Sequence, residues 1–173
     1  MKTLPFNEEV FYTDEEITKV NKEDIAWLKS KALANKRQRV RLCSHPGVED
    51  VLHEMLIVHV KDAYVRPHKH PEKSESFHMI EGQLNVIIFS EEGAIREIIE
   101  MGEYSSGRRF YYRLVKGAYH TVVPISEVVV FHEVTNGPFN RGDTIFAEWS
   151  PKEDDTAHQI LFLNELKQKA GKV

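Results

Sequence analysis

The chain has 173 residues, of which 41% are hydrophobic and 29% are charged, a balance that is ordinary for one globular domain. Its formal net charge is −4, which argues against a chain-wide surface for nucleic acid, and no apolar run approaches the ~20 residues of a membrane span. Cys43 is the single cysteine, and the N-terminus lacks the apolar core of a signal peptide. We therefore expect a cytoplasmic protein without a disulfide and without nucleic-acid or membrane partners.

The N-terminal part of the chain contains short β-prone segments at 10–12 and 17–20. Asn21 is typical of a helix N-cap, because two acidic residues follow it in the first turn, where the helix dipole favours negative charge. Apolar residues at helical spacing continue to about Ala34. Residues 1–36 are therefore expected to hold N-terminal strands and one helix.

Beyond this helix the pattern changes to short segments that are rich in Val, Ile and aromatic residues and are separated by Gly and Pro turns. Such a series of short strands predicts a β-sandwich or β-barrel. The expected strands are residues 40–43, 55–60, 77–80, 84–89, 95–101, 110–115, 120–123, 128–134 and 144–149. The barrel is expected to occupy 37–153 and a C-terminal helix 154–173, all within one structural domain.

Two histidines in the middle of the chain have the spacing of metal ligands. His68 and His70 point to the same face of an extended chain, because side chains alternate with a period of two. Glu75 opens the next strand and can add an anionic oxygen, and Gly82 would end that strand in a turn. Neutral imidazole and carboxylate together suit a divalent transition metal.

A second segment can bring another ligand to the same place. Gly117 forms a turn before a short strand, and His120 follows three residues later. In an antiparallel barrel this strand can lie beside the first segment. The metal ligands predicted from the residues are therefore His68, His70, Glu75 and His120.

These two segments resemble the two motifs of the cupin superfamily. The first motif is matched by His68, His70, Glu75 and Gly82, and the second by Gly117 and His120. The departures are at turn and neighbouring positions, where Asp62, Val115 and Pro124 replace the usual glycine, proline and asparagine. The stretches 64–75, 130–134 and 146–151, with the Gly-Pro-Phe at 137–139, look like WbuC-type cupin-fold metalloproteins, and this resemblance covers residues 37–153.

The resemblance implies an all-β cupin double-stranded β-helix, that is a jelly-roll barrel, with one helix before it and one after it. It also implies one divalent metal ion (Mn, Fe, Zn or Ni) and a place in bacterial surface-polysaccharide metabolism. We expect the protein to bind or act on a small polar molecule such as a sugar or sugar nucleotide, for example as a metal-dependent isomerase or epimerase. The alternatives are a non-catalytic metal-dependent binding or sensing module and an Fe(II)-dependent dioxygenase. Cupins often form dimers, so a homodimer is expected.

Five further residues are candidates for contacts with the small molecule. Phe77 shares the strand parity of Glu75 and should project into the barrel, whereas His78 should face outward. Only one of His132 and Glu133 can face inward, and the resemblance favours Glu133, although an ion pair at the sheet edge explains it equally well. As a titratable group facing the metal, Glu133 would be the candidate catalytic residue. The remaining candidates, which ordinary solvent exposure explains equally well, are expected at the mouth of the barrel: Tyr64, Arg66 and Lys73.

Overall fold

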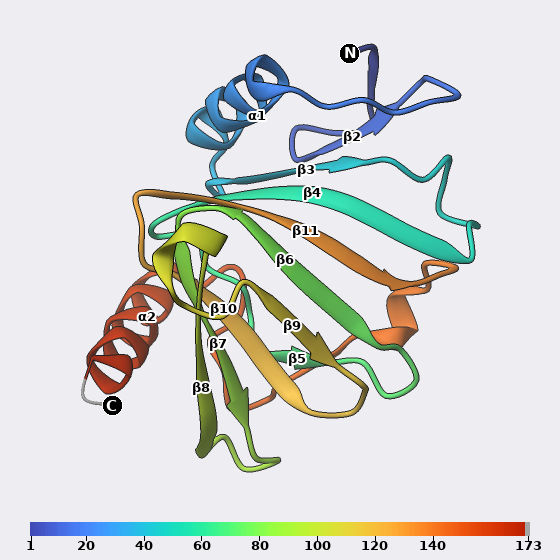
Figure 1. The fold of residues 1–173 in the computed structure, drawn as a ribbon. Helices are drawn as coiled ribbons and strands as arrows, with labels where there is room; N and C mark the ends of the chain where they lie inside the picture. The colour runs from blue at the N-terminus through green and yellow to red at the C-terminus, as the bar shows by residue number, and fades with distance from the viewer. Residues whose placement is uncertain (172–173) are drawn as a thin grey trace.

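The computed structural model describes residues 1–171, which fold into two β-sheets that face each other (Figure 1). Sheet A has the strand order β1-β2-β3-β4-β11-β6-β9, and sheet B has the order β12-β5-β10-β7-β8. Neighbouring strands are antiparallel except for the parallel pair β2 and β3. The strands are β1 (Thr3–Pro5), β2 (Val10–Thr13), β3 (Arg39–Cys43), β4 (Leu52–Val60), β5 (His68–Lys69), β6 (Glu75–Glu81), β7 (Gln83–Phe89), β8 (Ile95–Gly102), β9 (Tyr111–Leu114), β10 (Tyr119–Pro124), β11 (Val128–Asn136) and β12 (Ile145–Phe146).

The main core lies between the two sheets, where the inward-facing residues of each strand meet. Alternation along each strand decides which residues face inward. Those of sheet A include most of the aromatic and sulfur-containing side chains, and those of sheet B are mostly aliphatic. This core includes Cys43, Met55, Ile57, Phe77, Met79, Leu84, Val86, Ile88, Tyr112, Val122, Val129 and Phe131. Phe77, which was expected to project into the barrel, is buried there, and Cys43 is buried as well.

One helix covers the outer face of each sheet (Figure 1). Helix α1 (Lys22–Ala34) begins at the capping box of Asn21 and Asp24, and its Leu28 and Ala32 pack on the outward-facing residues of β3 and β4. Helix α2 (Thr156–Ala170) packs on the outer side of sheet B through leucines on one of its faces. Two short 3₁₀ helices, η1 (Tyr104–Ser106) and η2 (Arg141–Asp143), lie in connections between strands.

The expected fold class is confirmed, and the differences are at the ends of the barrel. Residues 17–20 form no strand, and Thr3–Pro5, which has little β propensity in its sequence, pairs with β2 instead. The last expected strand is shortened to Ile145–Phe146. The final two residues of the expected C-terminal segment 154–173 lie outside the described residues. Neither helix within residues 1–171 is long and apolar enough to cross a membrane.

Gly82 ends β6 and turns the chain toward β7 and sheet B. Its φ is +78°, and a Cβ atom at this position would lie 2.6 Å from the carbonyl oxygen of Val128. Glycine avoids both the clash and the left-handed strain. The turn expected after this strand is therefore present. It fixes where β6, the strand that begins at Glu75, lies relative to sheet B.

Candidate metal centre

Three histidines meet on the inner face of sheet B. His68 on β5 and His120 on β10 are direct partners in the antiparallel pair, and His70 follows His68 by two residues on the same side of the chain. One ring nitrogen of each lies within 4.8 Å of the ring nitrogens of the other two. The structure thus brings together the three histidines that the two sequence segments supply.

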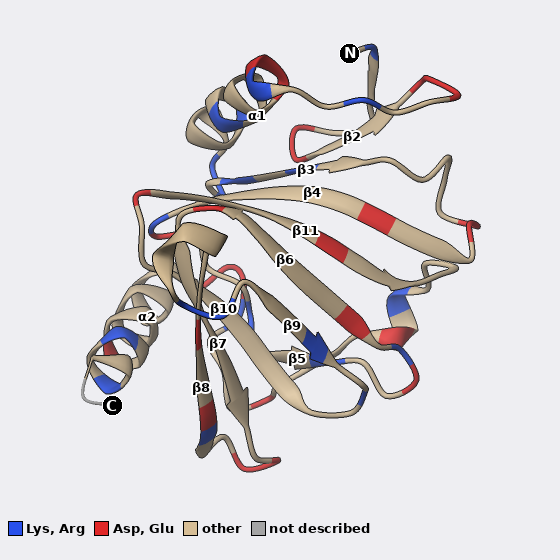
Figure 2. Cartoon of the chain, in the orientation of Figure 1, with Lys and Arg blue, Asp and Glu red and all other residues tan. Residues whose placement is uncertain are grey.

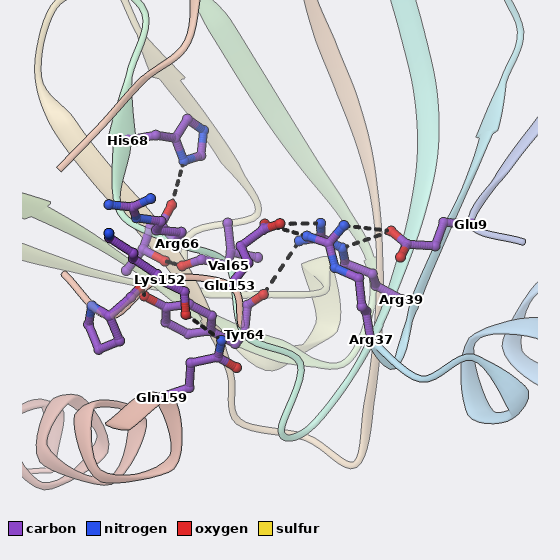
Figure 3. A network of polar contacts seen from close by, with 12 residues as sticks. Glu9, Arg37, Arg39, Tyr64, Val65, Arg66, His68, Lys152, Glu153 and Gln159 are labelled. Carbon is purple, nitrogen blue, oxygen red and sulfur yellow. Dashed lines mark hydrogen bonds and ion pairs between the residues drawn. The ribbon is translucent and has the colours of Figure 1, made fainter. Parts of the chain in front are cut away.

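A backbone carbonyl fixes the orientation of each of these imidazole rings through Nδ1. A carbonyl oxygen can only accept a hydrogen bond, so each Nδ1 carries a proton, and each ring has a free lone pair on Nε2 when it is neutral. Figure 3 shows this contact for His68. The Nδ1–carbonyl distances are 2.8 Å from His68 to Arg66, 3.1 Å from His70 to Asp143 and 3.0 Å from His120 to Ala118.

Glu75 reaches the histidines from the opposite sheet. It is the first residue of β6, its side chain is 4% exposed, and its Oε1 lies 3.1 Å from Nε2 of His120. Its Oε2 lies 3.9 Å from Nε2 of His70. Burial alone would raise the pKa of Glu75, but the adjacent His120, with the other two histidines, outweighs burial and lowers this pKa. The carboxylate is therefore held in its ionised, metal-binding form.

These four residues fit a divalent metal ion. Oε1 of Glu75 and Nε2 of His120 are buried and, within residues 1–171, neither has a hydrogen-bond partner, although they are only 3.1 Å apart. Ligand atoms that bind one metal at 2.0–2.2 Å lie about 3 Å from each other. Leaving such buried polar atoms unsatisfied is costly unless a ligand satisfies them. The three histidines are therefore placed so that they could hold a metal ion, and Glu75 lies beside them.

The pKa values of His68 and His120 are shifted in opposite directions. Burial, and then the charge of His120, lowers the pKa of His68 to about 3, so this imidazole is neutral at neutral pH. For His120 burial acts in the same direction, but the carboxylate of Glu75 outweighs it and raises the pKa. The His70 side chain is 20% exposed, against 2% for His120, so His70 is the more accessible of these two to solvent.

Two expected contact residues, Tyr64 and Arg66, are engaged elsewhere (Figure 3). The Tyr64 hydroxyl donates to the carbonyl of Pro151 at 2.7 Å, and its ring packs on the side of sheet B that α2 covers. The Arg66 guanidinium donates to the carbonyl of Ala147 at 2.9 Å and to Ser150 Oγ at 3.2 Å. The structure therefore does not bring the Tyr64 side chain to the histidines, and Arg66 contributes its backbone carbonyl, which orients His68.

Lys73, the third residue expected at the mouth, is also paired. Its Nζ lies 3.0 Å from Oδ2 of Asp143 and donates to the carbonyl of Pro138. Asp143 is the residue whose carbonyl holds His70. Lys73 thus anchors the segment that orients one ligand, and its charge is already compensated there.

Glu133 and Phe77 lie on the inner face of sheet A, which faces the three histidines; this part of the inner face is called the floor of the site. They are direct partners on β11 and β6, and Figure 2 shows acidic segments on both of these strands. Glu133 has the same parity as the buried Phe131, so it faces inward as expected, while His132 faces outward toward Glu54. Burial, and then the charge of Glu75, raises the pKa of Glu133 to about 8.

Sequence reasoning missed one residue of this floor, Tyr112 on β9. It is the direct partner of Phe77, its ring centroid lies 5.4 Å from that of Phe77, and it is 7% exposed. The alternation of 110–115 gave a weak signal for an inward face, but the face could be assigned only once the register with β6 was known.

Comparisons with known proteins agree with this fold. The family model described as Domain of unknown function (DUF6016) matches residues 20–101, which is less than half of the chain and includes His68, His70 and Glu75 but not His120. The search of curated proteins finds no match.

Solved structures that are similar to the chain include protein SO0799 from Shewanella oneidensis, with 12% identity and a TM-score of 0.52 over 61% of this chain and 72% of that chain. A mutant of oxalate decarboxylase OxdC from Bacillus subtilis has 24% identity and a TM-score of 0.46 over 57% of this chain and 25% of that chain. The Cnp3 cupin domain of Schizosaccharomyces pombe has 14% identity and a TM-score of 0.45 over 57% and 64%. At these identities the likeness concerns the fold alone, that is, two mostly antiparallel β-sheets that face each other.

Proposed function

We propose that this barrel holds one divalent metal ion through His68, His70, Glu75 and His120 and uses it to bind or transform a small polar molecule. One observation carries the proposal: each imidazole donates its Nδ1 proton to a carbonyl, and the three ring nitrogens converge beside an ionised, buried carboxylate. Backbone carbonyls that orient ligating histidines in this way are typical of metal sites.

The chain's own groups set the charge and the access of the site. Three neutral imidazoles and one carboxylate leave a bound dication with a net positive charge, which favours oxygen-rich and anionic ligands. A bound metal would supply Lewis-acid chemistry or an activated water molecule. Nitrogen and oxygen donors of this kind suit Mn, Fe, Zn and Ni, and the proposal includes any one of these four.

The substrate class rests on the resemblance of residues 37–153 to WbuC-type cupins. This resemblance supports the proposal that the chain belongs to the WbuC-type group. It also supports a sugar or sugar nucleotide as the small molecule and a role in surface-polysaccharide metabolism. A homodimer is part of the same proposal. The side-chain hydroxyl and carboxylate groups on the floor of the site are the kind that hydrogen-bond a polyhydroxylated ligand.

Metal content tests the first part of the proposal. Wild-type protein, purified without chelator and without an affinity tag, is expected to carry about one equivalent of metal per chain. His120→Ala should carry well below one equivalent, because removal of one of four ligands abolishes most of the affinity of the site for the metal. His78→Ala, which changes a histidine on the outer face of β6, serves as the matched control and should keep its metal. Circular dichroism checks that His120→Ala is folded. Equal metal content in wild type and folded His120→Ala would overturn the proposal.

The substrate class has its own test. The metal-loaded protein is mixed with glucose, glucose 1-phosphate and UDP-glucose, and binding is measured by calorimetry while turnover is followed by NMR. Turnover would identify an enzyme, and binding without turnover would identify a binding or sensing module. Absence of both for all three compounds would overturn the sugar class while leaving the metal centre in place.

A further inference from the structure

A buried tyrosine and a buried glutamate on the floor of the site each have an oxygen atom without a partner. Tyr112 is 7% exposed, and among the residues that the structure describes its hydroxyl has no hydrogen-bond partner. The same is true of Oε1 of Glu75, which is 4% exposed. A buried donor and a buried acceptor that lack partners each cost free energy. A hydrogen bond from Tyr112 to Glu75 would remove both costs.

The register of sheet A places these two side chains within reach of each other. Tyr112 on β9 is the direct partner of Phe77 on β6, and Glu75 precedes Phe77 by two residues on the same face of that strand. Tyr112 and Glu75 are therefore diagonal neighbours, a relation in which long side chains reach each other. The ring of Tyr112 also packs against that of Phe77, so the tyrosine lies over the strand that carries Glu75.

The charged groups around the hydroxyl are carboxylates, which favour its protonated form. Burial, and then the charges of Glu75, Glu133 and Glu97, raise the pKa of Tyr112. The hydroxyl therefore keeps its proton at neutral pH and is available as a hydrogen-bond donor. Surroundings of this charge favour donation to a carboxylate of the chain itself.

Among these three carboxylates, Glu75 is the one that fits as the acceptor. Glu133 is on β11, which is separated from β9 by β6. Glu97 is exposed on β8 of the other sheet, so water can satisfy its oxygens. Glu75 is on the strand next to Tyr112, and of the three it alone has a buried oxygen without a partner within residues 1–171. A carboxylate is also a stronger acceptor than a neutral oxygen.

We infer that the Tyr112 hydroxyl donates a hydrogen bond to the Glu75 carboxylate and holds that carboxylate in the orientation in which it binds the metal ion. The inference rests on the proposed metal centre and deepens it. Tyr112 is then a positioning residue, which acts on the ion only through Glu75. The carboxylate would thus be oriented by a group that does not bind the ion, as the three imidazoles are by backbone carbonyls.

The test measures cobalt binding, since the visible spectrum of Co(II) reports the geometry and charge of its ligands. Cobalt is titrated into metal-free wild type, Tyr112→Phe and Tyr111→Phe in competition with a chelator of known affinity, and the spectrum of each saturated protein is recorded. Tyr111 is the neighbouring tyrosine, 55% exposed on the opposite face of β9, and is the matched control. Circular dichroism checks that each variant is folded.

Tyr112→Phe is expected to bind cobalt about 10-fold or more weakly than wild type, because partners that orient metal ligands contribute about this much to affinity. Its absorption bands at saturation should also be shifted, a change that packing does not explain because phenylalanine keeps the ring. Tyr111→Phe should match wild type in both measurements. Absence of either change in folded Tyr112→Phe would overturn the inference. Failure of the wild type to bind cobalt would instead contradict the metal centre itself.

Discussion

The histidines of the proposed metal centre differ from His59 in the contacts of their ring nitrogens. His68, His70 and His120 each donate Nδ1 to a backbone carbonyl, which leaves Nε2 as the nitrogen that could bind an ion. His59 on β4 is also buried, but its Nδ1 has no partner within residues 1–171, and its ring packs edge-on against Phe131 with centroids 5.5 Å apart. Burial, and then the charge of Arg37, lowers its pKa to about 4.

His59 should therefore make stability depend on pH. An unfolded chain protonates this histidine below its ordinary pKa of about 6.5, whereas the folded protein keeps it neutral until about pH 4. Acidification from pH 7 to 5 consequently favours the unfolded state, by about 2 kcal/mol for this one group. Between pH 7 and 5 the free energy of unfolding should decrease less in His59→Leu than in wild type, and the difference should be about 2 kcal/mol. Urea denaturation of chelator-treated protein at both pH values measures it.

The matched control is His78→Leu, at an exposed histidine on the outer face of β6. It should follow the wild-type dependence on pH. A His59→Leu profile parallel to that of wild type would contradict the assignment of this pH dependence to His59.

The convergence of the three histidines was predictable at this scale because local sequence carries their spacing. The two-residue spacing of His68 and His70 sets a shared face, and the motif spacing adds Glu75 and His120. The contacts of Tyr64, Arg66 and Lys73 were not predictable, because their partners come from segments that follow them by 65 to 87 residues. Nothing in the sequence near a lysine shows which distant carbonyl or carboxylate will pair with it.

At the scale of elements, alternation of apolar residues predicted nearly every strand of the barrel. It failed at 17–20, where β-branched residues lie in a connection, and at Thr3–Pro5, where a short strand exists only because β2 is beside it. The helix over Lys22–Ala34 was predictable from its cap, and the structure adds that it lies on the outer face of sheet A, away from the metal ligands.

Replacement of Leu28 by alanine should separate stability from metal binding. Leu28 is fully buried between α1 and sheet A, so the cavity should cost about 2–5 kcal/mol in the free energy of unfolding. Leu33→Ala, at an exposed position of the same helix, should cost far less. Denaturant unfolding measures both variants. Metal content should stay at the wild-type level in each, and its loss in folded Leu28→Ala would contradict the separation of α1 from the site.

On the scale of the whole molecule, the proposed metal centre would join the two sheets. The histidines come from sheet B and the carboxylate from sheet A, so an ion bound to all four is a cross-link through the core. Ion pairs form a second link, between the N-terminal segment and the segment that precedes α2. Arg37 and Arg39 pair both with Glu9 and with Glu153 (Figure 3). Partly exposed pairs of this kind contribute little stability, so a bound ion would be the stronger link.

Removal of the metal should consequently lower the thermal stability of the entire barrel. At free metal of about 1,000 times the dissociation constant, binding contributes about 4 kcal/mol, which for a chain of this size corresponds to roughly 10 °C in the unfolding midpoint. Dialysis against a chelator, followed by calorimetry, should show this decrease, and adding the metal back should reverse it. Glu75→Gln should respond much less to both treatments, and a full wild-type response in that variant would show that the carboxylate does not bind the ion.

The carbonyl oxygens that orient the three imidazoles come from separate parts of the chain, and the one that holds His70 belongs to Asp143, 73 residues further on. Folding of the barrel therefore already removes the rotational freedom of the ligand rings, and the ion meets a preorganised site with little entropy left to lose. Affinity for the metal should thus depend on a segment that supplies no ligand. A chain cleaved between η2 and β12 would keep all four ligands and still bind the ion more weakly.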